Sequence, residues 1–241
     1  MWWAGSERLT IYLGASIVGV QRDGAVDAEW QDVDATVSGF EQAIQASSRH
    51  GGSMRRRLTI DLQLSGGLAR PFVLDAVRGL KNFREATELA SSIAPDSTGL
   101  TGPCVVWLDD WMPDRQCIAV AMDRSLRDQL EATAATGGVK LGAMRPWWSL
   151  AIDAAKSKFD EPLRLLAIED TDSLTLLDSA NAAHMSTSTH TPRLDPAPLR
   201  ATLARAALAA NLQPGDAVFA ALPQDDERHR HGLVPLVERW A

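Results

Sequence analysis

Hydrophobic and polar positions change their spacing along the chain, and each change predicts a new element. Apolar residues fill 9–20 in two short runs on either side of Gly14, which is typical of two strands joined by a tight turn. Leu and Ile alternate with polar residues in 58–64, which is the period of a half-buried strand. Further extended segments are predicted at 28–30, 104–110, 117–123, 139–144 and 216–222, a strand hairpin at 163–180, and a short helix or strand at 232–240.

Other stretches carry apolar residues at intervals of three and four, which predicts amphipathic helices. Ser38 is placed as an N-cap of the first of them, and Gly137-Gly138 ends the third. The segment 184–198 is polar and rich in proline, so we interpret it as a loop or linker. The predicted helices are 38–50, 74–93, 124–136, 146–156 and 199–212.

The order of these elements predicts the fold class. Strands and helices alternate through residue 156, and then a strand hairpin followed by a helix begins the same pattern again. Such alternation favours an α/β fold of mixed sheets flanked by helices. We expect two subdomains, 1–156 and 157–241, of which the second is reduced.

Composition narrows the class of protein. The chain has 241 residues, 45% of them hydrophobic, which is enough for a substantial core. Its net charge of −7 argues against nucleic acid as a partner, and the one basic run, 54–58, is short. No apolar run has the length of a membrane span and the N-terminus lacks the features of a signal peptide, so we expect a cytoplasmic protein without direct membrane insertion. Cys104 and Cys117 could face each other across a hairpin, but we expect buried thiols.

Three segments carry a resemblance to a known family. They are "RLTIYLGASIVGV" (8–20), "DRSLRDQLEATAATGGVKLGAMRPWWSLAI" (123–152) and the second hairpin "LRLLAIEDTDSLTLL" (163–177). In this pattern the chain resembles the actin-like cytoplasmic scaffold proteins of the PilM and GspL group, which serve type IV pilus and type II secretion machines. The resemblance implies an actin-like fold of two ribonuclease-H-like subdomains. It covers most of the chain as a pattern and includes no signature motif.

The resemblance also implies where nucleotide chemistry would lie. An active member has an Asp two residues before the first loop glycine, where it orients metal and water. Here that position is Tyr12, followed by Gly14 and Ser16. The second phosphate loop would need glycine for close approach of backbone N–H groups. The matching turn has none and is acidic, with Glu169, Asp170 and Asp172, and the family's late Gly-Gly adenosine loop has no counterpart after Ala180.

We therefore predict two degenerate phosphate loops, no catalytic residue, no bound metal and no cofactor. The resemblance then implies a non-catalytic scaffold that links an inner-membrane assembly platform to an assembly ATPase of a pilus or secretion system. We expect it in the cytoplasm, held at the inner membrane through a protein partner. The alternative is an active ATP-binding phosphotransferase or ATPase of the same superfamily.

Two groups of acidic residues suggest metal binding as an alternative. Asp109, Asp110 and Asp114 could hold a divalent metal as in a nuclease, but the first strand offers no matching carboxylate, so a solvated hairpin tip is expected. His229 and His231 follow the acidic run 225–227 and could bind Zn²⁺ on a strand. We expect an exposed loop with internal ion pairs there.

Eight tryptophans accompany a single tyrosine. In each of the pairs Trp147-Trp148 and Trp107/Trp111 we expect one ring in the core and one nearer the surface. An exposed tryptophan is a frequent interface anchor, so Trp2, Trp3 and Trp111 are candidates for partner binding. The alternative is that all of the rings are core or half-buried.

Overall fold

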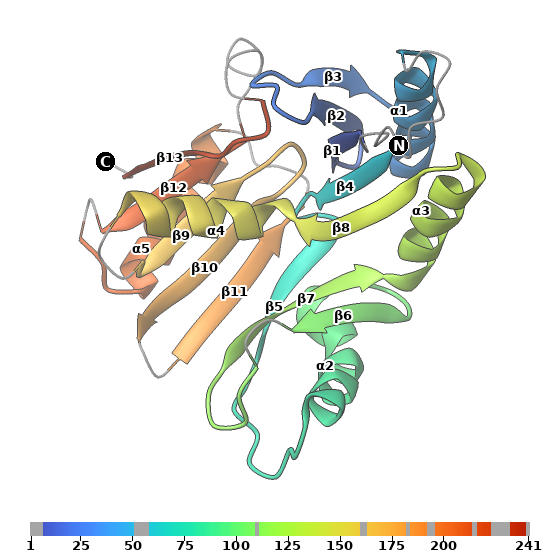
Figure 1. Cartoon of the computed structure of the whole chain (residues 1–241). Helices are drawn as coiled ribbons and strands as arrows, with labels where there is room; N and C mark the ends of the chain where they lie inside the picture. The colour runs from blue at the N-terminus through green and yellow to red at the C-terminus, as the bar shows by residue number, and fades with distance from the viewer. Residues whose placement is uncertain are drawn as a thin grey trace.

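A computed structural model of the chain describes residues 7–50, 58–108, 111–159, 163–181, 184–191, 196–213, 216–222 and 232–239. Two five-stranded sheets and one three-stranded sheet form the framework (Figure 1). The first sheet has the order β3-β2-β1-β4-β8, in which β1 runs antiparallel to β2 and parallel to β4. Its strands are β1 (Arg8–Leu13), β2 (Ile17–Arg22), β3 (Glu29–Asp32), β4 (Thr59–Leu64) and β8 (Lys140–Pro146).

The second large sheet repeats this order as β11-β10-β9-β12-β13. Here too the first strand of the set, β9, runs antiparallel to the next and parallel to the fourth. The fifth strands differ, because β8 is parallel to β4 whereas β13 is antiparallel to β12. The strands are β9 (Leu165–Glu169), β10 (Leu174–Asn181), β11 (His184–His190), β12 (Ala217–Ala221) and β13 (Leu236–Arg239).

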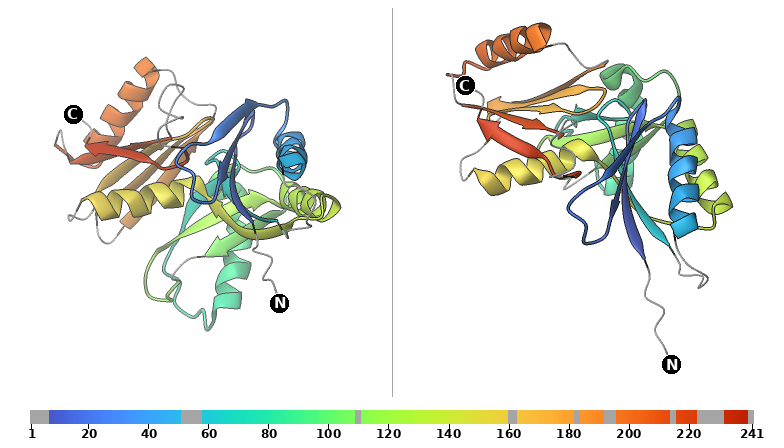
Figure 2. Two further views of the ribbon diagram at one scale, coloured as in Figure 1. Left: turned by 45° about the horizontal axis from the view of Figure 1, so that its top comes forward. Right: turned by 90° about the horizontal axis from the view of Figure 1, so that it is seen from above.

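Helices cover the large sheets differently. α1 (Thr36–His50) and α3 (Arg124–Thr136) pack against each other on one side of the first sheet (Figure 2). The second sheet lies between α4 (Trp147–Lys158) and α5 (Pro196–Ala209), as the view from above in Figure 2 shows. The predicted subdomain boundary at residue 156 falls in the last turn of α4.

A smaller unit is inserted between β4 and α3. Its sheet, β5-β7-β6, is antiparallel throughout and is covered by α2. α2 buries an alanine at every fourth position, Ala86, Ala90 and Ala94, which brings the helix close to the sheet. The elements are β5 (Ala69–Leu74), α2 (Phe83–Thr98), β6 (Cys104–Leu108) and β7 (Cys117–Asp123).

α4 ties the three units together through two adjacent tryptophans. Trp147 is fully buried and its indole Nε1–H donates to Leu233 O at 3.0 Å, next to β13. Trp148 is 4% exposed and donates to Ala69 O in the small sheet at 2.8 Å. The expectation of one core and one surface ring is therefore wrong for this pair, since both rings are core. It is also wrong for Trp107 and Trp111, which are both half-buried.

Most predicted strands and helices are confirmed, and the main errors concern helix starts. α2 begins at Phe83, nine residues after the predicted start at 74. Asn82 is its N-cap, because its side chain accepts the Glu85 N–H at 3.0 Å. Ser38 is not a cap: it lies within α1 and its hydroxyl donates to Ala35 O.

The predicted loop at 184–198 is wrong for its first half, because 184–190 forms β11. This strand pairs with β10 along its length and lies against β5 on its other side, where Thr187 Oγ1 donates to Pro71 O at 3.2 Å. Polar residues tolerate this position because both neighbours supply hydrogen-bond partners. Cross-strand pairing outweighed the polar composition that suggested a loop.

The two cysteines are free and buried, as expected, but they do not face each other. Cys104 lies opposite Asp123, whereas Cys117 lies opposite Leu74 at the other end of β7. Burial, with a smaller contribution from Asp123, raises the pKa of the Cys104 thiol. In the part of the chain that the structure describes, no helix has the length and apolar character needed to cross a bilayer.

Candidate functional site

Three turns meet at the place where the two large sheets approach each other. β1 and β4 are parallel neighbours, so the β1–β2 turn and the β4–β5 turn leave the sheet side by side, and Ser65 N–H donates to Leu13 O at 2.9 Å. The β9–β10 turn of the second sheet, 170–173, inserts between them. We call the contact formed by residues 12–15, 65–67 and 170–173 the turn junction.

The β9–β10 turn is organised by one side chain. Asp170 Oδ1 accepts the Ser173 hydroxyl at 2.8 Å and the N–H groups of Ser173 and Asp172 at 2.9 and 3.2 Å. A carboxyl that accepts hydrogen bonds from the backbone two and three residues later is the usual way in which Asp stabilises a tight turn. The turn needs no glycine for this reason.

The same turn also binds the first half of the molecule. Asp170 Oδ2 accepts Gly66 N–H at 2.7 Å. Asp172 Oδ2 accepts Ala15 N–H at 2.6 Å and the Ser65 hydroxyl at 2.9 Å. Two carboxylates thus occupy N–H groups of the two turns that follow β1 and β4.

Tyr12 and Thr171 complete the junction, with 2.9 Å between the phenol oxygen and Oγ1. The Tyr12 ring is fully buried and packs at a tilt against Trp30, with 5.6 Å between ring centroids. The turn that follows Tyr12 is held from α1 as well, because Thr36 Oγ1 donates to Gly14 O at 3.0 Å.

Two glycines make the close approach possible. A Cβ on Gly14 would lie 2.6 Å from Thr171 Oγ1, and a Cβ on Gly66 would lie 2.6 Å from Thr175 Oγ1 and 2.7 Å from Ser173 Oγ. Such distances are far shorter than ordinary van der Waals contact, so any other residue would push the turns apart. These glycines serve contact between the two halves of the chain.

Two side chains of the junction, Asp170 and Tyr12, have raised pKa values. Burial first, and then the charge of Asp172, raise the pKa of Asp170 to about 7, against the opposing effect of its hydrogen-bond donors. Burial, with Asp170 and Asp172 adding to it, also raises the pKa of Tyr12. Asp172 Oδ1 is buried and has no hydrogen-bond partner among the described residues. None of the ion pairs between described residues includes Asp170 or Asp172.

The structure brings together most of the residues predicted as degenerate phosphate loops. Tyr12, Gly14, Asp170 and Asp172 are all in the junction. Ser16 is exposed and contributes a backbone carbonyl that accepts Val33 N–H, and Glu169 is buried at the end of β9. Sequence reasoning missed Thr36, Ser65, Gly66, Thr171 and Ser173. The signal that could have found two of them is the "SGG" turn directly after a strand parallel to β1.

Of the other predicted site residues, the candidate partner-binding Trp111 lies away from the junction. Trp111 is half-buried and packs against the core of the small sheet. Trp2, Trp3, Asp109, Asp110, 225–227, His229 and His231 lie outside the described residues. Within the described ranges, no three His, Cys, Asp or Glu side chains are grouped as metal ligands would be.

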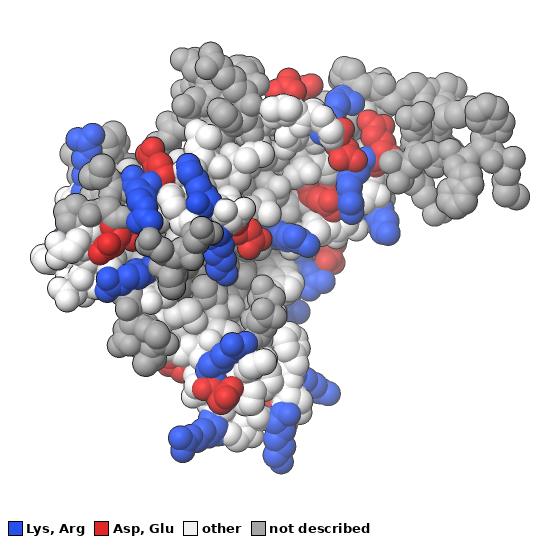
Figure 3. Space-filling view, turned by 60° about the vertical axis from the view of Figure 1, so that its left-hand side comes forward, with Lys and Arg blue, Asp and Glu red and all other residues white. Residues whose placement is uncertain are grey.

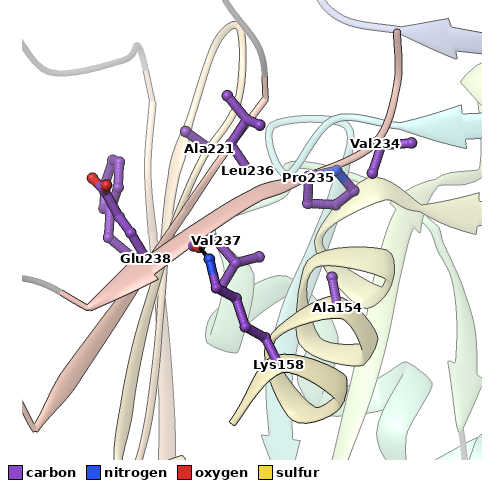
Figure 4. A pocket seen from close by; sticks show the side chains of 9 residues that line it. Ala154, Lys158, Ala221, Val234, Pro235, Leu236, Val237 and Glu238 are labelled. Atoms are coloured by element: carbon purple, nitrogen blue, oxygen red, sulfur yellow. Dashed lines mark hydrogen bonds between the residues drawn. The ribbon is translucent and has the colours of Figure 1, made fainter. Parts of the chain in front are cut away.

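A groove of about 600 Å³ lies beside β13. Ala154 and Lys158 of α4 form one wall and 234–238 the other, and the Lys158 ammonium donates to Val237 O (Figure 4). The groove is lined by apolar side chains and backbone together with Lys158 and Glu238.

On the face shown in Figure 3, Lys and Arg side chains are interspersed with Asp and Glu, without a continuous basic surface.

Comparison with known proteins identifies the fold. No protein-family model matches the sequence, and neither does any curated protein. A Bacteroides thetaiotaomicron protein of unknown function with an actin-like ATPase fold matches with a TM-score of 0.56 and 8% identity, over 93% of this chain and 85% of that one. PilM in the PilM-PilN type IV pilus biogenesis complex matches with a TM-score of 0.52 and 14% identity, over 85% of this chain and 68% of that one.

A third match is the cytoplasmic domain of EpsL, an inner-membrane component of the type II secretion system of Vibrio cholerae. Its TM-score is 0.44 at 12% identity, over 76% of this chain and 71% of that one. At these identities the comparisons concern the fold alone. The chain has the actin-like fold, and the resemblance noted in the sequence is confirmed at that level.

Proposed function

We propose that this protein is a non-catalytic actin-like scaffold that binds an inner-membrane protein of a type IV pilus or type II secretion system. The observation that carries the proposal is the turn junction. Asp172 accepts the backbone N–H of Ala15, in the β1–β2 turn where the resemblance implies a first phosphate loop, and Asp170 accepts the N–H of Gly66 in the neighbouring β4–β5 turn. The protein's own carboxylates take the place of a ligand's oxygens.

Physical chemistry opposes nucleotide binding at such a site. Phosphate binding depends on free N–H donors, on close backbone approach and on a surplus of positive charge. Here the N–H groups of Ala15 and Gly66 are both engaged by carboxylates. Tyr12, which stands where the resemblance implies a metal-orienting Asp, lacks a carboxylate and is sealed by Thr171 and Trp30. A nucleotide would have to displace the β9–β10 turn and then lie beside two acidic side chains.

The partner is proposed from the fold shared with PilM, whose solved complex contains PilN. By analogy, this chain binds a cytoplasmic segment of an inner-membrane platform protein, and so acts at the inner membrane without inserting into it. A second contact with an assembly ATPase completes the scaffold role. The mechanism is binding, with no chemical step.

The first experiment is calorimetric titration with ATP and Mg²⁺, beside thermal melts with and without nucleotide. We expect neither heat nor a shift of the melting temperature at millimolar ATP. A ligand present at a hundred times its Kd would add about 2.7 kcal/mol to the free energy of unfolding, which is a shift of roughly 5–10 °C at this chain length. Binding in the micromolar range would overturn the non-catalytic proposal in favour of an ATPase or phosphotransferase, and hydrolysis would be assayed next.

The partner is tested by co-expression with single-span inner-membrane proteins encoded beside this chain's gene. We expect one of them to co-purify through its cytoplasmic segment, and a synthetic peptide of that segment to bind in calorimetry. A variant of the partner that lacks the segment is the control. A genomic neighbourhood without any such protein, or no binding by the peptide, would contradict the scaffold role.

A further inference from the structure

The turn junction holds the two halves of the molecule together, and three of its inter-half hydrogen bonds, from Ala15, Ser65 and Gly66, end on two carboxyl groups. We propose that Asp170 and Asp172 form a proton-linked latch: the latch is tight while the pair carries one negative charge and loosens when both groups are ionised. This inference goes beyond the scaffold function and does not depend on it, since it concerns how the chain's own halves are joined.

The geometry makes the two carboxyls the central elements of the latch. Asp170 uses one oxygen for its own turn and the other for Gly66, so it couples the shape of the turn to the contact. Asp172 joins the same turn to Ala15 and Ser65. A change at either carboxyl therefore acts on the β1–β2 and β4–β5 turns together.

A cation lies at the β4–β5 turn, but the Arg70 guanidinium donates to Gly67 O at 3.2 Å and to Thr98 O at 2.8 Å. No ion pair between described residues includes Asp170 or Asp172. The titratable groups that face the pair are Tyr12 from β1 and, at the end of β9, the buried Glu169. The β1–β2 and β4–β5 turns present only N–H and hydroxyl donors, from Ala15, Ser65 and Gly66. Asp170 and Asp172 are close enough that the N–H of one donates to the carboxyl of the other at 3.2 Å. Asp170 is buried and Asp172 is half-buried, and two like charges in such a partly desolvated site oppose each other.

The raised pKa of Asp170 agrees with this geometry and gives the sign of the effect. In the closed junction the group titrates at about 7, whereas an exposed Asp titrates near 3.8. Between these values the closed form holds a proton that the open form releases, so opening becomes easier as pH rises. Above the higher value both forms are ionised, and the pH dependence ends. The stabilisation is complete below about pH 4 and is lost as pH rises through about 7.

Hydrogen exchange at the Ala15 and Gly66 amides tests the latch in the wild-type chain, because these amides donate to the two carboxyls. After correction for the intrinsic pH dependence of exchange, we expect protection to fall by about tenfold per pH unit between pH 5 and pH 7 and to level off by pH 8. Amides in the middle of α1, such as Phe40 and Ile44, serve as internal references and should not follow this curve. Protection of Ala15 and Gly66 that is flat from pH 5 to pH 8 would overturn the proposal.

A variant sharpens the test. Asp172→Asn removes the neighbouring charge while keeping an acceptor oxygen, so the pKa of Asp170 should fall and the loss of protection between pH 5 and pH 7 should shrink to less than tenfold. Asp128→Asn, at an exposed acid on α3, removes the same charge elsewhere and should leave the wild-type curve unchanged. An unaltered curve in Asp172→Asn would contradict the latch. If that variant does not fold, carboxyl ¹³C titration of the wild type decides: Asp170 titrating near 7 supports the proposal, and titration below 5 overturns it.

Discussion

The β1–β2 hairpin and the β9–β10 hairpin occupy equivalent places in two sheets of the same strand order, yet their turns have opposite chemistry. The first turn, with the β4–β5 turn beside it, presents backbone N–H groups and small residues. The second presents carboxylates that accept from them. In a phosphate site, donors on both sides would face a shared ligand. Here the carboxylates of the second turn accept the N–H groups of the first side, so the two equivalent hairpins form a contact between the halves of the chain.

The two sheets also differ at their fifth strands. β8 reaches its place parallel to β4 after the small sheet and α3, whereas β13 returns antiparallel to β12. A parallel neighbour needs a long crossover, which the first half has and which includes α3. The second half has a much shorter segment, 222–235, between its fourth and fifth strands, and its fifth strand borders the groove beside α4.

Tyr12→Asp is the substitution that we expect to destabilise the contact between the two turns most. It introduces the carboxylate that the family's active members have, but into a buried site that already contains Asp170 and Asp172. We expect a loss of about 4 kcal/mol in the free energy of unfolding at pH 7, from an additional buried negative charge and the lost packing against Trp30. Urea denaturation measures it.

Tyr12→Phe is the matched control for this prediction. It keeps the ring and removes only the hydroxyl that contacts Thr171, so about 1 kcal/mol should be lost. If the Asp variant were as stable as the Phe variant, or gained binding of Mg²⁺ and ATP, the junction would not be the closed contact described here.

The sequence predicts the elements of this contact better than the contact itself. Apolar runs on either side of turn residues predict both hairpins, and the sequence shows that 169–172 is acidic. What the pattern lacks is any sign that Asp170 reaches Gly66, a residue 104 positions away. The "SGG" segment (65–67) predicts only a turn after a strand, because close approach between distant segments leaves no periodic trace.

Errors elsewhere in the fold have similar physical causes. The composition of β11 predicts a loop because it has few apolar residues, whereas the strand is held by hydrogen bonds to the strands on both sides. The start of α2 was predicted too early since apolar spacing continues through 74–82, whereas Asn82 decides where the helix begins. Periodicity identifies an element more reliably than its boundaries.

Gly66→Ala should disrupt the approach of the two halves with a smaller effect than a buried charge. The new Cβ would meet the hydroxyls of Thr175 and Ser173, both in buried residues, and we expect a loss of about 2 kcal/mol in the free energy of unfolding. Gly24→Ala provides the comparison: its Cβ would meet nothing within 4 Å, so only the strain of its left-handed φ of +79° remains. That strain costs about 1 kcal/mol. No loss of stability in Gly66→Ala would mean that the turns can separate without penalty.

Ser65→Ala tests the weakest of the contacts to Asp172. Its hydroxyl donates to Oδ2 at 2.9 Å, but Ala15 N–H donates to the same oxygen, so Asp172 keeps a partner in the variant. We expect a loss of about 1 kcal/mol in the free energy of unfolding at pH 7. A double-mutant cycle with Asp172→Asn isolates the pair, because a real contact gives a coupling energy of at least about 0.5 kcal/mol. Strict additivity would show that Ser65 stabilises the β4–β5 turn alone, and that Ala15 and Gly66 carry the contact between the halves.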